Sequence, residues 1–220
     1  MTGDRARILG AEALGTFALV LFGCGAIMVD AEGGRLGHVG ISLAFGLVVM
    51  AMVCVFAHVS GAHINPAVTL SLATRRRLSW ALVPGYWGAQ ITGAIAAASV
   101  LRASLGDVAN LGATTPSGSD AQSFVWELLM TGTLLAVILA AATDTRVSIG
   151  AAAVAIGGTI ALASLVGGPI SGASLNPARS VGPALVSGEL GSLWIYLTAP
   201  LLGGLVGALA FDKLRPSAPP

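Results

Sequence analysis

The octapeptide SGAHINPA at residues 60–67 recurs almost unchanged as SGASLNPA at residues 171–178. The two Asn-Pro-Ala triplets lie 111 positions apart in a chain of 220 residues, which indicates a duplicated unit. Asn is a favoured N-cap, and Pro is favoured at the first helical position, where its missing N–H would have had no partner. Each triplet, Asn65-Pro66-Ala67 and Asn176-Pro177-Ala178, therefore predicts the start of a helix that follows an extended segment.

The composition indicates the environment in which the protein folds. Hydrophobic residues make up 55% of the chain and charged residues only 10%, whereas soluble domains carry roughly 25% charged residues. The chain is therefore expected to be an integral membrane protein, with the lipid bilayer as its surroundings. The formal net charge of +1 offers no basic face for nucleic acid. Cys24 and Cys54 lie in apolar runs without metal-ligand spacing, so no metal or cofactor is expected.

Six apolar segments are long enough to cross a bilayer, which takes about 20 helical residues. They lie near residues 8–29, 38–59, 80–102, 122–142, 148–167 and 192–211. Two further segments, from Pro66 to about Thr74 and from Pro177 to about Val186, would each cover only about 15 Å, half of the bilayer core. We expect an all-α membrane protein with six transmembrane helices and two re-entrant half-helices. One domain would span residues 1–220, with repeats over about 1–106 and 120–220 joined by a linker at 107–119.

The basic residues suggest the orientation. Most of them, above all the triplet Arg75-Arg76-Arg77, fall on one side of the six-span arrangement, and the positive-inside rule places that side in the cytoplasm. Both chain ends would then be cytoplasmic in a plasma or inner membrane. An odd number of spans separates the two motifs, so the halves have opposite orientations. Inverted repeats of this kind occur in channels and transporters whose site lies near the bilayer midplane.

The repeated motif also predicts chemistry. In inverted halves, both half-helices direct their N-termini, each with a partial positive charge, toward the midplane. The amides of Asn65 and Asn176 add N–H donors there. Irregular backbone at membrane depth is tolerated where it lines a watery cavity, and its carbonyls then serve as acceptors. Such a centre repels cations and suits neutral, oxygen-bearing solutes that pass in single file.

Several features together resemble the aquaporin or major intrinsic protein family over essentially the whole chain. They are Glu12, Gly15-Thr16, the doubled Asn-Pro-Ala motif and Arg179. Residues 61–65, 142–144 and above all 168–180 are most similar to the plant nodulin-like intrinsic branch and its bacterial relatives. The resemblance implies a channel for water, glycerol and uncharged metalloid acids, and a homotetramer with a separate pore in each subunit.

The resemblance also implies roles for individual residues. The selectivity filter would be formed by Phe45, Ser164, Ala173 and Arg179. Ser164 stands where strict water channels carry His, so the filter should be wider, although the bulk of Phe45 makes an intermediate aperture the expectation. Ser180 stands where glycerol facilitators typically carry Asp, which argues against a standard glycerol channel.

The buried carboxylates Glu12 and Glu127 occupy corresponding places in the two halves. The resemblance suggests that they accept hydrogen bonds from the irregular loop backbones. A secondary transporter is the alternative, because it would use paired ionisable residues for coupling to an ion gradient; only these two residues and Arg179 are available. An intramembrane enzyme is disfavoured, since His58 and His63 form no HExxH pattern. We interpret these histidines as structural rather than as pH gates. Small residues such as Gly88, Gly93 and Gly203 suggest close helix packing.

Overall fold

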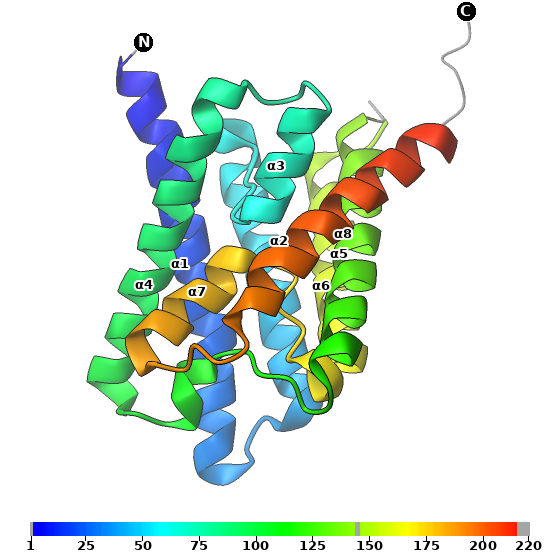
Figure 1. Cartoon of the computed structure of the whole chain (residues 1–220). Coiled ribbons are helices and arrows are strands. Elements are labelled where there is room, and N and C mark those ends of the chain that lie inside the picture. The colour runs from blue at the N-terminus through cyan, green and yellow to red at the C-terminus, as the bar shows by residue number, and fades with distance from the viewer. Residues whose placement is uncertain (1, 144–145, 215–220) are drawn as a thin grey trace, which may run out of the picture.

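The computed structural model describes residues 2–143 and 146–214, and this part of the chain is all-helical, with its longest described connection at residues 106–119 (Figure 1). The helices are α1 (Thr2–Gly33), α2 (Gly37–Ser60), α3 (Pro66–Thr74), α4 (Val83–Leu105), α5 (Asp120–Thr143), α6 (Ile149–Ser171), α7 (Pro177–Ser187) and α8 (Leu193–Leu214), with 3₁₀ turns η1 (Trp80–Leu82) and η2 (Ala109–Gly112). Residues 1, 144–145 and 215–220 of the predicted domain lie outside the described part.

The six long helices confirm the predicted fold class. Among the described residues, five of them are both long and apolar enough to cross a membrane: α1, α2, α5, α6 and α8. The sixth, α4, is 23 residues long, which gives a length of about 35 Å at 1.5 Å per residue. Its hydropathy is lower because Gly, Ala and Gln90 replace larger apolar residues. The two short helices α3 and α7 begin at Pro66 and Pro177, as predicted.

Helix α6 continues past its predicted end near residue 167 to Ser171, although Pro169 lies inside it. Proline lacks the N–H that would bond to the carbonyl four residues earlier, so the Leu165 oxygen loses its helical donor. The Nε2 atom of His38, from the start of α2, lies 2.8 Å from this oxygen. A side chain from another helix therefore fills the acceptor that Pro169 leaves open, and the helix extends one turn further than its sequence indicates.

The two halves of the chain make equivalent helix contacts. Helix α1 packs against α2 and α4, as α5 packs against α6 and α8. Each half-helix packs against a long helix of the other half, α3 against α8 and α7 against α4. Helices α2 and α6 join the two halves through their mutual contact (Figure 1). This arrangement is the inverted repeat expected from the doubled octapeptide. The exact repeat boundaries, 1–106 and 120–220, stay a prediction.

Glycines allow the closest of these contacts. A Cβ atom on Gly93 of α4 would overlap the Ala13 carbonyl of α1, and one on Gly203 of α8 would overlap the Leu128 carbonyl of α5. The prediction of close packing was wrong for Gly88, where an added Cβ would meet nothing within 4 Å.

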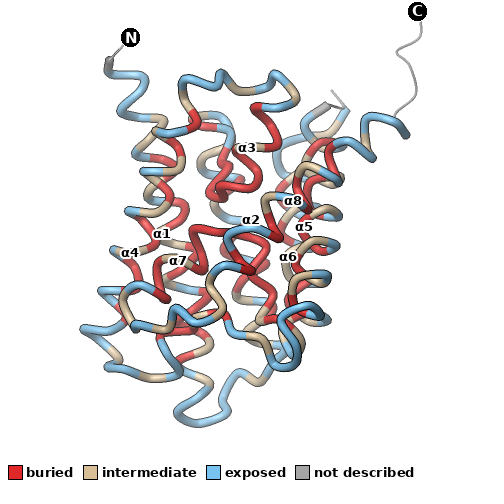
Figure 2. The backbone as a smooth tube through the Cα atoms, in the orientation of Figure 1, coloured by how far each residue is buried: buried red, intermediate tan, exposed pale blue. Residues whose placement is uncertain are grey.

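Burial follows the membrane pattern. Figure 2 shows the buried backbone gathered in the interior, including most of α3 and α7, while the outer faces of the long helices are exposed. The exposed side chains on these faces are largely apolar, for example Phe22, Leu47 and Leu162. Polar and charged side chains are buried instead, including Glu12, Gln90 and Glu127. The interior of the helix bundle therefore holds the chemistry, and the outside suits lipid.

Candidate functional site

A cavity of about 390 Å³ lies between the two halves. One part of its lining is apolar and comes from α2, α5 and α6, with side chains such as Val49, Leu134 and Ile156. The other part is formed by the loops at residues 61–65 and 173–176, which lead into the half-helices. The lining includes the predicted residues Phe45, Asn65, Ser164, Ala173, Asn176 and Arg179. No described residue of the lining carries a carboxylate.

The two loops have the same unusual backbone. Each begins with a left-handed glycine, Gly61 (φ 86°) or Gly172 (φ 80°). Ala62 (φ 48°) and Ile64 (φ 42°) follow in the first loop, and Ala173 (φ 44°) and Leu175 (φ 55°) in the second. The simple extended segment predicted before each triplet was therefore wrong. Positive φ at a non-glycine residue is uncommon and strained, so surrounding contacts must hold it.

The first of these contacts is made by Glu12 of α1. Its Oε1 atom accepts hydrogen bonds from the Ser60 hydroxyl (2.6 Å) and the His63 amide (2.9 Å). Its Oε2 atom accepts from the Ile64 amide (2.6 Å) and the Gln90 side chain (2.8 Å). Both carboxylate oxygens are thus occupied by donors that fix the first loop.

Glu127 of α5 does the same for the second loop. Its Oε1 atom accepts from the Ser171 hydroxyl (2.8 Å) and the Ser174 amide (2.8 Å). Its Oε2 atom accepts from the Leu175 amide (2.7 Å). Neither Glu127 nor Glu12 belongs to the cavity lining. The two carboxylates shape the loops from behind.

Sequence reasoning missed three buried side chains that support the loops. Tyr86 donates from its hydroxyl to the Ser60 carbonyl (2.8 Å), and Tyr196 donates to the Ser171 carbonyl (2.7 Å). Gln90 links Glu12 to the hydroxyl of Thr69. The tyrosines occupy similar positions after the two triplets, and this repetition was the available signal.

Asn65 and Asn176 tie the halves together at the centre. The Oδ1 atom of Asn65 accepts from the Ala67 amide (2.8 Å), and that of Asn176 accepts from the Ala178 amide (3.0 Å), which confirms both N-caps. The Nδ2 atom of Asn65 donates to the Leu175 carbonyl, and that of Asn176 donates to the Ile64 carbonyl, both at 2.8 Å. An amide nitrogen carries two N–H groups, so each side chain keeps one donor for the cavity.

The remaining residues of the predicted pore centre form the first turns of the half-helices. Pro66, Ala67, Pro177 and Ala178 are buried, but the cavity lining does not include them. Their part is to begin α3 and α7 at the same depth, so that both helix N-termini point to the two asparagines. The N-terminus of a helix carries a partial positive charge.

One end of the cavity is marked by Arg179, whose side chain is only 1% exposed. Its guanidinium carbon lies 4.9 Å from the centroid of the Phe45 ring. Its Nη1 atom donates to the Gly112 carbonyl (2.8 Å), while its Nε atom has no partner. Gly112 belongs to the predicted linker, whose contribution the sequence did not indicate.

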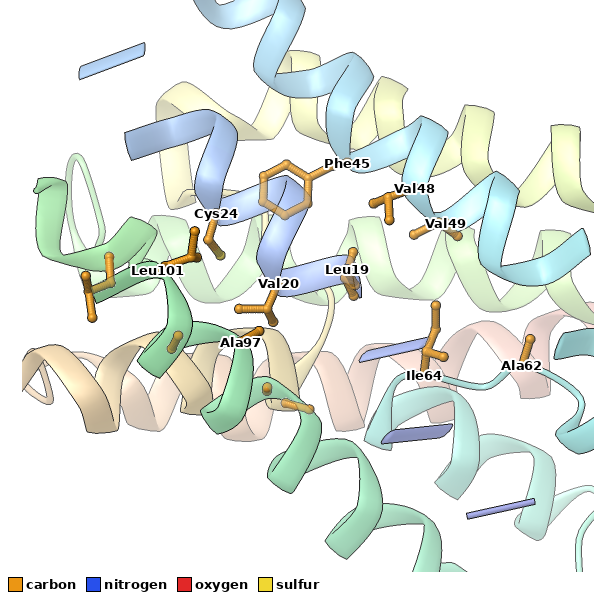
Figure 3. Close-up of a cluster of buried hydrophobic side chains, with 14 of the residues drawn as sticks. Leu19, Val20, Cys24, Phe45, Val48, Val49, Ala62, Ile64, Ala97 and Leu101 are labelled. Carbon is orange, nitrogen blue, oxygen red and sulfur yellow. The ribbon is translucent and has the colours of Figure 1, made fainter. Parts of the chain in front are cut away.

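Phe45 lies in the largest apolar cluster of the protein, beside Leu19, Val20 and Cys24 of α1 (Figure 3). A Cβ atom at Gly23 would overlap the Phe45 ring, so the glycine makes room for it. The ring is therefore held by packing on one side and by the Arg179 guanidinium on the other. Ser164 from α6 and Ala173 from the second loop complete the predicted set on the same lining.

The opposite end of the cavity is lined by Arg77, Val147 and Ile149. The Nη1 atom of Arg77 donates to the Ala142 carbonyl at 3.4 Å. His63 lines the cavity between this end and the asparagines, and its Nδ1 atom lies 3.1 Å from the Thr69 hydroxyl. His58 is exposed and is absent from the lining.

Comparisons with known proteins agree with this architecture. The model of the major intrinsic protein family matches residues 2–211. Aquaporin NIP1-1 of Oryza sativa subsp. japonica is 46% identical over 207 residues, which are 93% of this chain and 73% of the relative. Aquaporin NIP2-1 of Zea mays is 44% identical over 205 residues, covering 93% and 70% of the two chains. The X-ray structure of the aquaglyceroporin from Plasmodium falciparum is similar with a TM-score of 0.87 at 29% identity, over 96% of each chain.

These relatives confirm the predicted resemblance to the aquaporins and to their nodulin-like branch. Proteins of this family are membrane channels for water and small solutes, and they are not enzymes. On the match over nearly its whole length, the chain belongs to the major intrinsic protein family, the aquaporins.

Proposed function

We propose that this channel passes water together with small uncharged solutes, namely glycerol-like polyols and uncharged metalloid acids, and excludes ions and protons. The observation that carries the proposal is the two-sided lining of the cavity. Apolar side chains of α2, α5 and α6 line the cavity together with the two loops, Asn65, Asn176 and Arg179. A polyol has hydroxyl groups and a hydrocarbon backbone, and both find matching surfaces on such a lining.

The proposed selectivity filter consists of Phe45, Ser164, Ala173 and Arg179. Arg179 supplies positive charge and an unpaired Nε donor, and Phe45 supplies an apolar face. Ser164 and Ala173 are small, which leaves room for a solute larger than water. The similarity to a solved aquaglyceroporin supports this reading of the aperture.

Exclusion of ions would come from the centre and from the lining. The partial positive charges at the N-termini of α3 and α7 oppose a cation. The described lining offers no carboxylate to balance a cation's charge. An anion would have to give up its hydration to pass the apolar wall, which is costly. The remaining donors of the two asparagines would orient each water oxygen and interrupt proton hopping along the file.

The surroundings of the channel are proposed as well. The channel lies in a cell membrane with both termini on the cytoplasmic side, as the distribution of arginines suggests. The family resemblance favours a homotetramer with one pore per subunit. Glu12 and Glu127 serve as structural carboxylates, because loop donors occupy them. That engagement disfavours the transporter alternative, which needs carboxylates free to bind the coupling ion.

The test is stopped-flow light scattering on proteoliposomes with water, glycerol, urea and an uncharged metalloid acid. A channel gives solute fluxes that rise linearly with the gradient and do not change when proton or sodium gradients are collapsed. Saturable or ion-coupled flux would support the transporter instead. Absence of flux for every neutral solute would contradict both readings.

A further inference from the structure

Three buried hydroxyl groups form a chain between the linker and the second re-entrant loop. The Thr114 hydroxyl lies 2.7 Å from that of Ser180, and the Ser180 hydroxyl lies 2.6 Å from that of Ser174. Ser174 in turn lies 2.9 Å from the backbone carbonyl of Asn176. The three side chains are buried, with exposures of 7% for Thr114, 0% for Ser180 and 6% for Ser174.

We propose that this chain, Thr114 to Ser180 to Ser174, positions the selectivity filter and sets its discrimination between solute and water. The inference rests on the proposed function, because it assigns positioning residues to the filter of that channel. Thr114 and Ser180 do not line the cavity, so they act through the residues beside them.

The donor and acceptor in each of these hydroxyl hydrogen bonds follow from the number of protons available. Each hydroxyl carries one proton and two acceptor lone pairs. Ser174 gives its proton to the Asn176 carbonyl, so Ser180 must be the donor to Ser174. Thr114 must then be the donor to Ser180. A carboxylate at position 180 would have no proton for Ser174, so this chain depends on a hydroxyl there.

The chain acts on two filter residues through their neighbours in sequence. Ser180 follows Arg179, and Ser174 follows Ala173, so the bond between the two hydroxyls sets the separation of these filter positions. The linker also contacts Arg179 directly, because the Gly112 carbonyl accepts a hydrogen bond from the Arg179 guanidinium. The Thr114 methyl group also packs against Gly172, where an added Cβ would lie 3.2 Å from it. The linker thus clamps the loop and Arg179 together.

The corresponding residues of the first repeat have different hydrogen-bond partners. Thr69 and His63 stand at the positions that correspond to Ser180 and Ser174. Their side chains are 3.1 Å apart, and Gln90 connects Thr69 to Glu12 inside the bundle. The hydroxyl of Thr69 is therefore bonded to a side chain of the transmembrane helix α4, whereas the hydroxyl of Ser180 is bonded to a side chain of the linker. This difference places the linker contact on the half that carries Arg179.

The experiment measures glycerol and water permeability of proteoliposomes for Thr114→Val, Thr114→Ala and Ser180→Ala. Thr114→Ser keeps the hydroxyl and serves as the rescue variant. Thr131→Val is the matched control, since Thr131 is fully buried but bonds only to a carbonyl of its own helix. The loss of one hydrogen bond, roughly 1 kcal/mol, should lower the glycerol-to-water ratio by about fivefold. Thr114→Ser and Thr131→Val should keep the ratio of the unmodified protein.

The outcomes are distinguishable. An unmodified protein that conducts, with hydroxyl-deleting variants whose ratio stays the same, overturns this inference alone. A ratio that falls equally in Thr114→Ser or Thr131→Val also overturns it, because packing rather than the hydroxyl chain would then be responsible. An unmodified protein without glycerol flux overturns the proposed function and this inference together. Thr114→Ala provides the test if the larger Val prevents folding.

Discussion

Arg179 combines near-complete burial with an unpaired Nε donor. A buried donor without a partner costs about 1–3 kcal/mol, so the protein retains Arg179 at an energetic cost. The same guanidinium contributes a full positive charge at one end of the cavity. Its effect on a neutral solute is attractive, and its effect on a cation is repulsive.

The Arg179→Val substitution removes this charge without filling the cavity. Uncharged glycerol should still pass, while methylammonium, which the unmodified protein is proposed to exclude, should begin to cross. A pH-sensitive dye enclosed in proteoliposomes reports the methylammonium flux. Arg35→Val is the control, because that side chain is exposed outside the cavity. Equal exclusion of methylammonium by both variants would contradict the assignment of Arg179.

Glu12 holds the first re-entrant loop through hydrogen bonds from the His63 and Ile64 amides. Glu12→Gln places an NH₂ group where the carboxylate now accepts two hydrogen bonds, so donors face donors. Leaving such groups unsatisfied costs about 1–3 kcal/mol, and the melting temperature should fall by roughly 2–4 °C for each kcal/mol. Thermal unfolding of the purified protein measures this. Glu32→Gln, at the exposed end of α1, should melt like the unmodified protein. A Glu12→Gln variant that melts with it would show that the loop does not depend on the carboxylate.

At the scale of helices, the contacts of α1 with α4 and of α5 with α8 depend on glycine. Gly93→Ala and Gly203→Ala should each destabilise the protein, since the added methyl group meets a backbone carbonyl that cannot move aside. Overpacking of this kind costs about 1–3 kcal/mol. Gly88→Ala, in open space on the same helix as Gly93, should be neutral or slightly stabilising. Melting of the three variants decides this, and equal melting temperatures would contradict the packing account.

The half-helices were the most predictable elements, because Asn and Pro specify a helix start through local capping alone. Other features depend on partners far away in the sequence. The left-handed backbone at Ala62 and Ile64 could not be predicted, since neither residue type favours positive φ. It is stabilised by hydrogen bonds from the Ala62 amide to the Ser60 hydroxyl and from the Ile64 amide to Glu12. The extension of α6 beyond Pro169 depends on His38 in the same way. Contacts between distant segments therefore decide what local sequence leaves open.

For the whole molecule, duplication and composition were enough to predict an inverted helical repeat, because each half contains the same set of signals. The candidate site was less completely predicted. Its asparagines and Arg179 belong to recognisable motifs, but Gly112 contributes only a backbone carbonyl, which any residue possesses. Nothing in the composition of the linker distinguishes such a carbonyl from others.

The proposed orientation can be tested on the intact molecule. The linker at 107–119 should face outward and the α3–α4 connection should face the cytoplasm, so Ser117→Cys should react with a membrane-impermeant maleimide on intact cells. Ser79→Cys should react only after the membrane is permeabilised. Both positions are exposed. The native Cys24 is buried and Cys54 lies on an apolar helix face, so the unmodified protein is the blank. Labelling of Ser79→Cys in intact cells would reverse the topology.

We propose that neutral solutes cross through the cavity and are selected at Phe45, Ser164, Ala173 and Arg179. The most direct test is stopped-flow measurement of glycerol and water permeability for the unmodified protein and for Ser164→His in proteoliposomes. The imidazole narrows the filter, so glycerol flux should fall by roughly tenfold or more, while water flux falls much less. Equal losses of glycerol and water flux, or no loss of either, would contradict the placement of the filter.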